Sequence, residues 1–128
     1  MAEVGLARIY EPRAPGEGER ILVDRLWPRG VARESPLFDR WLKQVAPSSE
    51  LRRWYGHLPA RRPEFAVRYR GELGTGAAAE ELARLVELAH DSQLTLVTAT
   101  RALHLSAAVI LAEVLAERLS RPAVAAAR

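Results

Sequence analysis

Two spacings of hydrophobic residues divide this 128-residue chain into predicted strands and helices. Short apolar runs rich in β-branched residues are typical of buried strands. Such runs predict strands over 4–10, 21–24 and 94–98. Only a loop over 11–19, with two Pro and two Gly, separates the first two strands, so we expect them to form a hairpin or a neighbouring pair.

Apolar residues three and four positions apart predict the helices. Ser48 or Ser49 can cap a helix that runs through about His57, because a serine oxygen accepts hydrogen bonds from the free amides of a first turn. Further helices are predicted from about 64 to 73, over 77–90 and over 106–119. Segment 38–45 has helical spacing too, although an extended conformation also fits it.

The alternation of strand and helix after residue 77 predicts an α/β fold. We expect one small domain over 1–119, with a short, mostly parallel or mixed sheet flanked by helices, and a frayed tail over 120–128. The helix over 106–119 is apolar nearly all round. Such a helix is expected either inside the core or at the contact between two copies of the chain, so a homo-oligomer through this helix is one prediction.

The composition excludes several kinds of functional site. The chain has no Cys, which excludes disulfides, thiolate metal sites and cysteine nucleophiles, and its three His are too scattered to predict a metal site. No glycine-rich phosphate loop is present, so dinucleotide and P-loop sites are not expected and no cofactor is predicted. The first residues do not resemble a secretory signal and no apolar run is long enough to span a bilayer, so we expect a cytoplasmic protein without a membrane partner.

Charge is unevenly distributed along the chain. Residues 1–70 carry 14 Arg or Lys and 9 Asp or Glu, whereas 71–128 carry 5 and 7. This asymmetry indicates either an anionic partner or a solvated basic surface. Residues 51–70 alone hold six Arg and one acidic residue, interleaved with Trp and Tyr, a composition that would suit nucleic acid.

The strongest site candidate is the stretch from 21 to 30. Three apolar residues of a predicted strand lead into Asp24, Arg25, Trp27 and Arg29, and a Pro and a Gly then stop regular structure. Open α/β sheets bind ligands beyond the carboxyl ends of their strands, so we expect the two Arg, with Trp27, to hold a carboxylate or phosphate. The structural alternative is that Asp24 pairs with an Arg and fixes the loop.

A second candidate is the stretch 98–101, which follows the last predicted strand. Arg101 and the start of the last helix would both favour an anion there. The alternative is that Thr100 caps the helix and Arg101 lies on the surface.

Three residues are candidate acids or bases, namely Asp24, His57 and Glu72. His57 stands at a helix end, where a positive charge is also favoured by the helix dipole alone. Glu72 is expected to be solvated unless it pairs with Arg25 or Arg29. Trp54 and Tyr69 have the spacing of core residues, but we also count them as candidate ligand contacts.

Several motifs together resemble a known family. They are Asp-Arg-Leu-Trp-Pro-Arg-Gly at 24–30, Trp-Leu-Lys at 41–43, Pro-Ser-Ser-Glu-Leu-Arg at 47–52, Trp-Tyr-Gly-His at 54–57, and Phe65, Tyr69, Glu72 and Leu73. With these motifs the chain resembles the YeaO-like family of domains of unknown function (DUF488) from residue 8 to residue 119. The resemblance implies a small α/β domain of bacterial type, with the loop at 24–30 as its site and no established activity.

One departure from this family lies near the last helix. Relatives often carry Asn-His-Ala where this chain has Leu105-Ser106-Ala107. His104 is close in sequence, and whether it takes the place of the missing histidine is left open.

Two hypotheses about function follow. The first is that Arg25, Arg29 and Arg101 line a site for an anionic small molecule, such as a phosphate, nucleotide or carboxylate, with or without catalysis. The second is a non-catalytic nucleic-acid-binding or regulatory module that uses the basic stretch 51–70.

Overall fold

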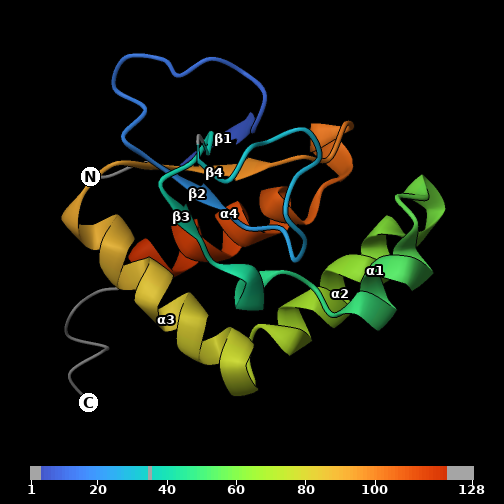
Figure 1. Ribbon diagram of the computed structural model, residues 1–128. Coiled ribbons are helices and arrows are strands. Elements are labelled where there is room, and N and C mark those ends of the chain that lie inside the picture. Colours follow the sequence, from blue (N-terminus) through green and yellow to red (C-terminus); the bar gives the residue numbers. More distant parts are fainter. Residues whose placement is uncertain (1–3, 35, 121–128) are drawn as a thin grey trace.

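A computed structural model describes residues 4–34 and 36–120, and it has an α/β fold (Figure 1). Four strands form one parallel sheet in the order β1-β4-β2-β3. The strands are β1 (Val4–Arg8), β2 (Glu19–Leu22), β3 (Arg40–Trp41) and β4 (Leu94–Thr98). The predicted small α/β fold is therefore confirmed, and its sheet is the parallel form of the two that were expected.

The predicted helices are present as well. They are α1 (Ser49–Tyr55), α2 (Arg62–Glu72), α3 (Gly76–Asp91) and α4 (Ala107–Leu119). Ser48 caps α1, because its side-chain oxygen accepts from the Leu51 amide at 3.1 Å. The ambiguous segment 38–45 is not an α-helix. It contains β3, followed by a single 3-10 turn over Lys43–Val45.

The predicted pairing of the first two strands is wrong. β1 and β2 do not pair with each other, because β4 lies between them and hydrogen-bonds to both in parallel. All five residues of β4 are buried, and a strand covered on both faces takes the centre of a parallel sheet. The early loop is therefore a connection between two strands that flank a third, and not a hairpin turn.

The two faces of the sheet are covered differently (Figure 1). The helices cover one face, where Ile21, Val23, Leu94 and Leu96 belong to the larger core cluster together with the helix side chains. The other face carries a smaller apolar cluster, and it is covered by the loop over 9–18 and by residues 23–34 and 36–39. Members of this second cluster are Ala7, Ile9, Leu22, Val31, Phe38 and Val97.

The apolar side chains of α4 pack against other elements of the same chain. The helix contacts β1, β4, α2 and α3. It buries five side chains, those of Ala108, Ile110, Leu111, Val114 and Leu115. A homo-oligomer through this helix stays a prediction.

Within the described ranges no helix has the length and apolarity that a membrane crossing needs. The prediction of a frayed tail falls, apart from Ser120, outside the described residues.

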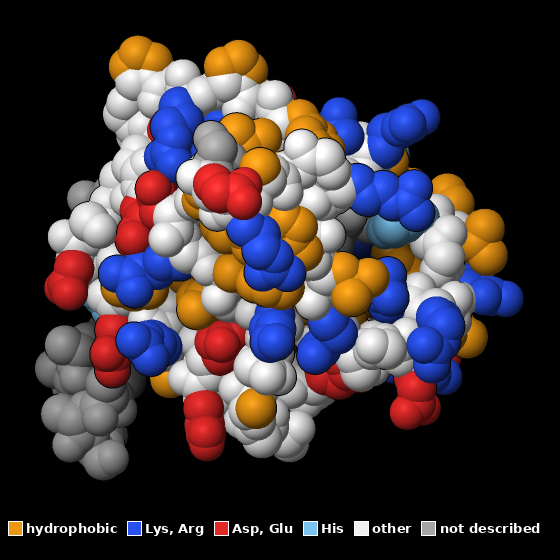
Figure 2. Space-filling view, viewed as in Figure 1, with side chains coloured by type: hydrophobic (Ala, Val, Ile, Leu, Met, Phe, Trp, Pro, Cys, Tyr) orange, Lys and Arg blue, Asp and Glu red, His pale blue; other side chains and the backbone are white. Residues whose placement is uncertain are grey.

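Surface charge follows the uneven sequence distribution. In Figure 2, basic side chains dominate the side of the molecule where α1 lies in Figure 1, and acidic side chains are more frequent toward the opposite side, where α3 lies.

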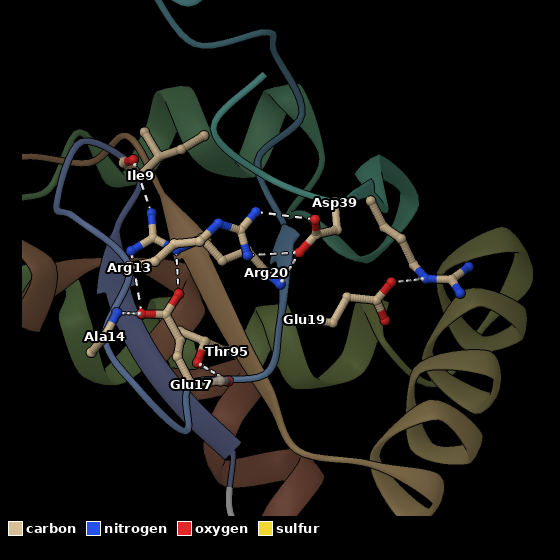
Figure 3. A network of polar contacts seen from close by, with 9 residues as sticks. Ile9, Arg13, Ala14, Glu17, Glu19, Arg20, Asp39 and Thr95 are labelled. Carbon is tan, nitrogen blue, oxygen red and sulfur yellow. Dashed lines mark hydrogen bonds and ion pairs between the residues drawn. The ribbon is translucent and has the colours of Figure 1, made fainter. Parts of the chain in front are cut away.

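A buried ion pair ties the loop over 9–18 to the sheet (Figure 3). Arg20 on β2 is 2% exposed, and its guanidinium donates to both carboxylate oxygens of Glu17 and to the Ile9 carbonyl. Glu17 in turn accepts from the Ala14 amide at 3.0 Å, and its own carbonyl accepts from the Thr95 hydroxyl at 2.8 Å. These bonds hold the long polar loop, which runs from the carboxyl end of β1 to the start of β2, against the sheet.

Glycine is required where this loop enters β2. Gly18 has a φ of +75°, and a Cβ atom at this position would lie 2.1 Å from the Gln93 carbonyl oxygen. Only glycine combines this backbone conformation with such a close approach.

Substitution of Glu17 by Ala is expected to lower the free energy of unfolding by about 3 kcal/mol, because it leaves the charge of Arg20 buried without its partner. Arg13→Ala is the control. It removes the exposed Arg13–Asp39 pair, whose side chains are 48% and 40% exposed, and should change stability by less than about 1 kcal/mol. Urea denaturation of both variants at pH 7 measures the difference, and equal losses would contradict the buried role of Glu17.

The effect of Glu17→Ala should depend on pH. The hydrogen bond from Arg20 lowers the pKa of the Glu17 carboxyl below its ordinary value. Its stabilising contribution is therefore full above the ordinary pKa of a glutamate and is lost as the pH falls through the lowered pKa. The difference between wild type and variant should shrink in denaturation series taken from pH 5 downward.

Candidate functional site

The carboxyl ends of β1, β2 and β4 meet at one edge of the sheet, and a cavity of about 370 Å³ lies beyond them. Residues just after each of these strands line it, and α1 and its C-terminal turn close the other side. The cavity lining includes Tyr10, residues 23–29, Ala46, Pro47, Arg52, Tyr55, His57, Phe65, Ala99, Thr100 and Ala107. The predicted position of a site beyond the strand ends thus coincides with a cavity.

Asp24 joins two of the three strand ends. Its Oδ1 accepts from the Thr98 hydroxyl at 2.6 Å and its Oδ2 from the Ala99 amide at 2.8 Å. Its backbone carbonyl accepts from the Trp41 indole at 2.7 Å. Among the described residues Asp24 forms no ion pair, so the predicted internal pair with an Arg is absent there.

Burial decides the protonation chemistry of Asp24. Desolvation raises the pKa of its carboxyl, and the bonds from Thr98 and Ala99 and the charges of Arg52 and His57 offset only part of this rise. A partly buried carboxyl group in a cavity, with a raised pKa and no cation bonded to it, is a typical functional group.

Arg25 and Trp27 hold the loop in shape. The Arg25 guanidinium donates to the Ala46 and Pro47 carbonyls at 2.9 and 3.0 Å, so its Nε and Nη2 are both bonded within the protein. The Trp27 indole donates to the Val31 carbonyl at 2.7 Å. Its ring packs edge-on against Phe38 and Trp41, and one surface still lines the cavity.

Arg29 is presented to solvent at the mouth of the cavity. Its backbone carbonyl accepts from the Tyr10 hydroxyl at 2.9 Å, whereas its side chain makes no hydrogen bond or ion pair with the described residues. Gly30 follows with a φ of +74°, a conformation that favours glycine and turns the chain back after the charged residues.

The C-terminal end of α1 supplies the opposite rim. Gly56 ends the helix in the left-handed conformation, and His57 has a φ of 57° as well, which is uncommon for a residue with a side chain. The His57 ring lies edge-on to Tyr55 and lines the cavity. Arg52, one helical turn earlier, also lines it, and its side chain has no hydrogen-bond or ion-pair partner among the described residues.

Four of the predicted site residues do not line this cavity, namely Trp54, Tyr69, Glu72 and Arg101. Glu72 is half-buried and is not paired with Arg25 or Arg29. Its carboxylate accepts from the backbone amide and the hydroxyl of Ser48, at 2.8 and 2.6 Å. Trp54 and Glu72 line a separate open groove, and Trp54 lies between the guanidinium groups of Arg61 and Arg68. Tyr69 is 1% exposed in the core, where its hydroxyl donates to the Val45 carbonyl and burial raises its pKa.

The second predicted site lies only partly at the cavity. Thr100 lines it, whereas Arg101 is exposed and does not. Thr100 does not cap the last helix, because a 3-10 turn over Leu103–Leu105 intervenes and Ser106 stands at the N-cap of α4. His104 is exposed within that turn and is not part of the cavity wall, where Ala107 lies instead.

Intramolecular contacts use most of the six Arg in the basic stretch. Arg62 donates to the Leu105 and Ser106 carbonyls, Arg68 pairs with Glu64, and Arg70 pairs with Glu113 and Glu117. The guanidinium group of Arg61 donates to the Trp54 carbonyl and lies over its ring. Nothing among these contacts favours nucleic acid, and that function stays a prediction. No group of three His, Asp or Glu in the described part of the chain is arranged to hold a metal ion.

Sequence reasoning missed Tyr10 and Arg52. Tyr10 follows β1 at the same sheet edge, so the rule that pointed to residues 24–29 applies to it too. Arg52 carried no such signal, because it points away from the apolar face of α1 and only the packing of this helix brings it to the cavity.

The fold and the cavity define the class of this protein as a small parallel α/β protein with a cationic cavity at the carboxyl edge of its sheet. The family model described as "Inactive DUF488-N3 subclade" matches residues 3–128, and the chain belongs to this family.

Relatives support the same assignment. The uncharacterized protein Rv3073c of Mycobacterium tuberculosis is 48% identical over 112 residues, which are 88% of this chain and 92% of the relative. The uncharacterized protein YeaO of Escherichia coli is 35% identical over 106 residues, 83% of this chain and 90% of the relative. The resemblance to the YeaO-like DUF488 family is thereby confirmed. No solved structure matches the chain significantly.

Asp24→Asn should make the protein more stable than wild type as the pH rises. Because the folded state raises the pKa of Asp24, its ionisation weakens the folded state between its ordinary pKa and the raised value. The melting temperature of the variant relative to wild type should therefore rise from pH 4 to pH 7.

Asp39→Asn is the control with the opposite sign, because Arg13 lowers the pKa of Asp39. This variant should lose stability relative to wild type over the acidic range as the pH rises through the lowered pKa. Parallel pH profiles of the two variants would contradict the assigned environment of Asp24.

Glu72→Ala should lower the free energy of unfolding by about 1–2 kcal/mol, because the amide and hydroxyl of Ser48 lose their acceptor. Glu64→Ala, on the exposed side of the same helix, should change stability by less than about 0.5 kcal/mol. Chemical denaturation compares the two. An equal loss in both variants would show that Glu72 does not anchor the start of α1.

Proposed function

We propose that this protein binds a small anionic molecule with an apolar body in the cavity at the carboxyl edge of the sheet, and that it does so without turnover. The observation that carries the proposal is the convergence on one cavity of the side chains of Arg29 and Arg52, which have no hydrogen-bond or ion-pair partner among the described residues. Guanidinium groups bind carboxylates and phosphates through two parallel hydrogen bonds.

The walls of the cavity favour an apolar body over a bare inorganic anion. Val23, Ala46 and Phe65 are at most 4% exposed and contribute to its wall. Its volume falls in the range of about 300–1,000 Å³ that is usual for sites of small organic ligands.

Binding without turnover is supported by the family description, which calls this subclade inactive. Of the three candidate acids and bases, only Asp24 and His57 line the cavity, whereas the Glu72 carboxylate is bonded to Ser48 elsewhere. Where relatives often carry a histidine at the start of the last helix, this chain has Ser106, which does not line the cavity.

Calorimetric titration with inorganic phosphate, phenyl phosphate and benzoate tests this function. Phenyl phosphate should bind at least about tenfold more tightly than inorganic phosphate, because only its ring buries apolar surface in the cavity. Arg29→Ala and Arg52→Ala should each weaken its binding by about tenfold.

Arg53→Ala is the matched control, since Arg53 is exposed on the same helix and does not line the cavity. Phenyl phosphate should also be recovered unchanged after long incubation, as followed by phosphorus NMR. Absence of binding by all three probes, or equal losses in the Arg53 and Arg52 variants, would contradict the proposal.

A further inference from the structure

The described residues occupy only half of the hydrogen-bond acceptor positions of the Asp24 carboxylate. Each of its oxygens accepts one hydrogen bond, Oδ1 from Thr98 and Oδ2 from Ala99. A carboxylate oxygen has two lone pairs, so two acceptor positions remain, one on each oxygen. Because Asp24 lines the cavity, a ligand can meet both positions with two adjacent N–H donors.

The side chains around Asp24 favour a ligand whose two N–H donors belong to a flat ring. Phe65 and Tyr55 are stacked with ring centroids 3.9 Å apart, and both line the cavity. Trp27, Ala46 and Pro47 add further apolar surface. Aromatic and apolar surfaces of this kind bind the faces of nucleobases, because every base has a π-face.

The rim of the cavity adds the third feature, a place for negative charge. Arg29 belongs to the loop after β2 and Arg52 to α1, so two cationic side chains flank the opening from different elements. A ligand that satisfies all three features has adjacent N–H donors, a flat ring and a phosphate.

We propose that the ligand is a guanine nucleotide whose base binds Asp24 through its N1–H and exocyclic amine, with the phosphate between Arg29 and Arg52. This inference rests on the proposed function and names the ligand class of the same site. The guanine edge offers two neighbouring donors to the two free acceptor positions of the carboxylate, a paired geometry that strengthens charge-assisted hydrogen bonds. Adenine has an unprotonated N1 that faces the carboxylate with a lone pair, and hypoxanthine keeps only the N1–H.

Calorimetric titration with GMP, IMP and AMP tests the base. GMP should bind most tightly, and IMP should bind about tenfold more weakly because it lacks one charge-assisted hydrogen bond. AMP should bind at least about 100-fold more weakly than GMP, because it presents an acceptor to an acceptor. Inorganic phosphate serves as the reference without a base.

Asp24→Asn should change which base the site prefers, guanine or xanthine. A purely structural role of Asp24 would not produce this change. The Asn amide donates where the carboxylate accepted, so it should repel the guanine amine and donate to the 2-oxo oxygen of xanthine. The Asn oxygen can keep the Ala99 bond, and the Thr98 hydroxyl can rotate to accept from the amide, so the variant should fold. Wild type should prefer GMP over XMP by at least about tenfold, and the variant should reverse this order.

The possible failures are distinguishable. Equal binding of GMP and AMP that Arg29→Ala weakens and Arg53→Ala does not would overturn the guanine inference and leave the anion-binding function standing. Binding of phenyl phosphate without binding of any nucleotide would do the same. Absence of binding by every anion would overturn both.

Discussion

The hydrogen bonds from Thr98 and Ala99 to the Asp24 carboxylate are the interaction on which the site depends. β2 and β4 pair in parallel along their length, but nothing in a parallel ladder fixes the chain after the last residue of a strand. Asp24 provides this fixation, and the indole of Trp41 adds the end of β3 through the Asp24 carbonyl. The loop that follows therefore starts from a defined position, and its Arg and Trp side chains are directed by packing. The same carboxylate is partly desolvated, which raises its pKa, so the group that organises the site is also an acid whose protonation the site alters.

Arg25 and Arg29 lie in the same loop but have different roles, because their guanidinium groups have different surroundings. Arg25 lies one residue after Asp24 and donates to the Ala46 and Pro47 carbonyls, which joins the loop to the segment before α1. Arg29 lies beyond the Trp-Pro pair, and only its backbone is held, by the Tyr10 hydroxyl. A guanidinium group whose donors are bonded to carbonyls gives rigidity, whereas one left in solvent at a cavity mouth is available to an anion. The loop therefore combines a structural and a free cation within five residues.

Periodicity and capping predicted most of the elements because they act over a few residues. Ser48 caps α1 as expected, and the buried run 94–98 forms β4 as expected. Strand order was not predictable in this way. The order β1-β4-β2-β3 depends on which strand can be covered on both faces, and this is decided by contacts with helices far away in the sequence. Within the site, Asp24 to Arg29 could be found from the sequence because charged residues directly follow a predicted strand. Arg52 and Tyr10 enter from other elements, and Glu72 carries a charge whose partner, Ser48, lies 24 residues away.

The strain at the end of α1 connects this packing with binding. His57 has a positive φ directly after Gly56, and a residue with a Cβ adopts this conformation at a free-energy cost of about 1–2 kcal/mol unless its surroundings compensate. The compensation visible here is the edge-on contact of the His57 ring with Tyr55, whose hydroxyl is itself fixed by the Leu105 carbonyl at 2.8 Å. Arg62 donates to the same carbonyl, so α1, α2 and the start of α4 share one polar junction behind the cavity. A ligand that contacts His57 and Arg52 on the rim would therefore rest on a wall braced by three helices, while its other side meets a loop fixed by Asp24. Both walls are held by hydrogen bonds and ring contacts within the protein, and a site preorganised in this way loses little conformational entropy when it is filled.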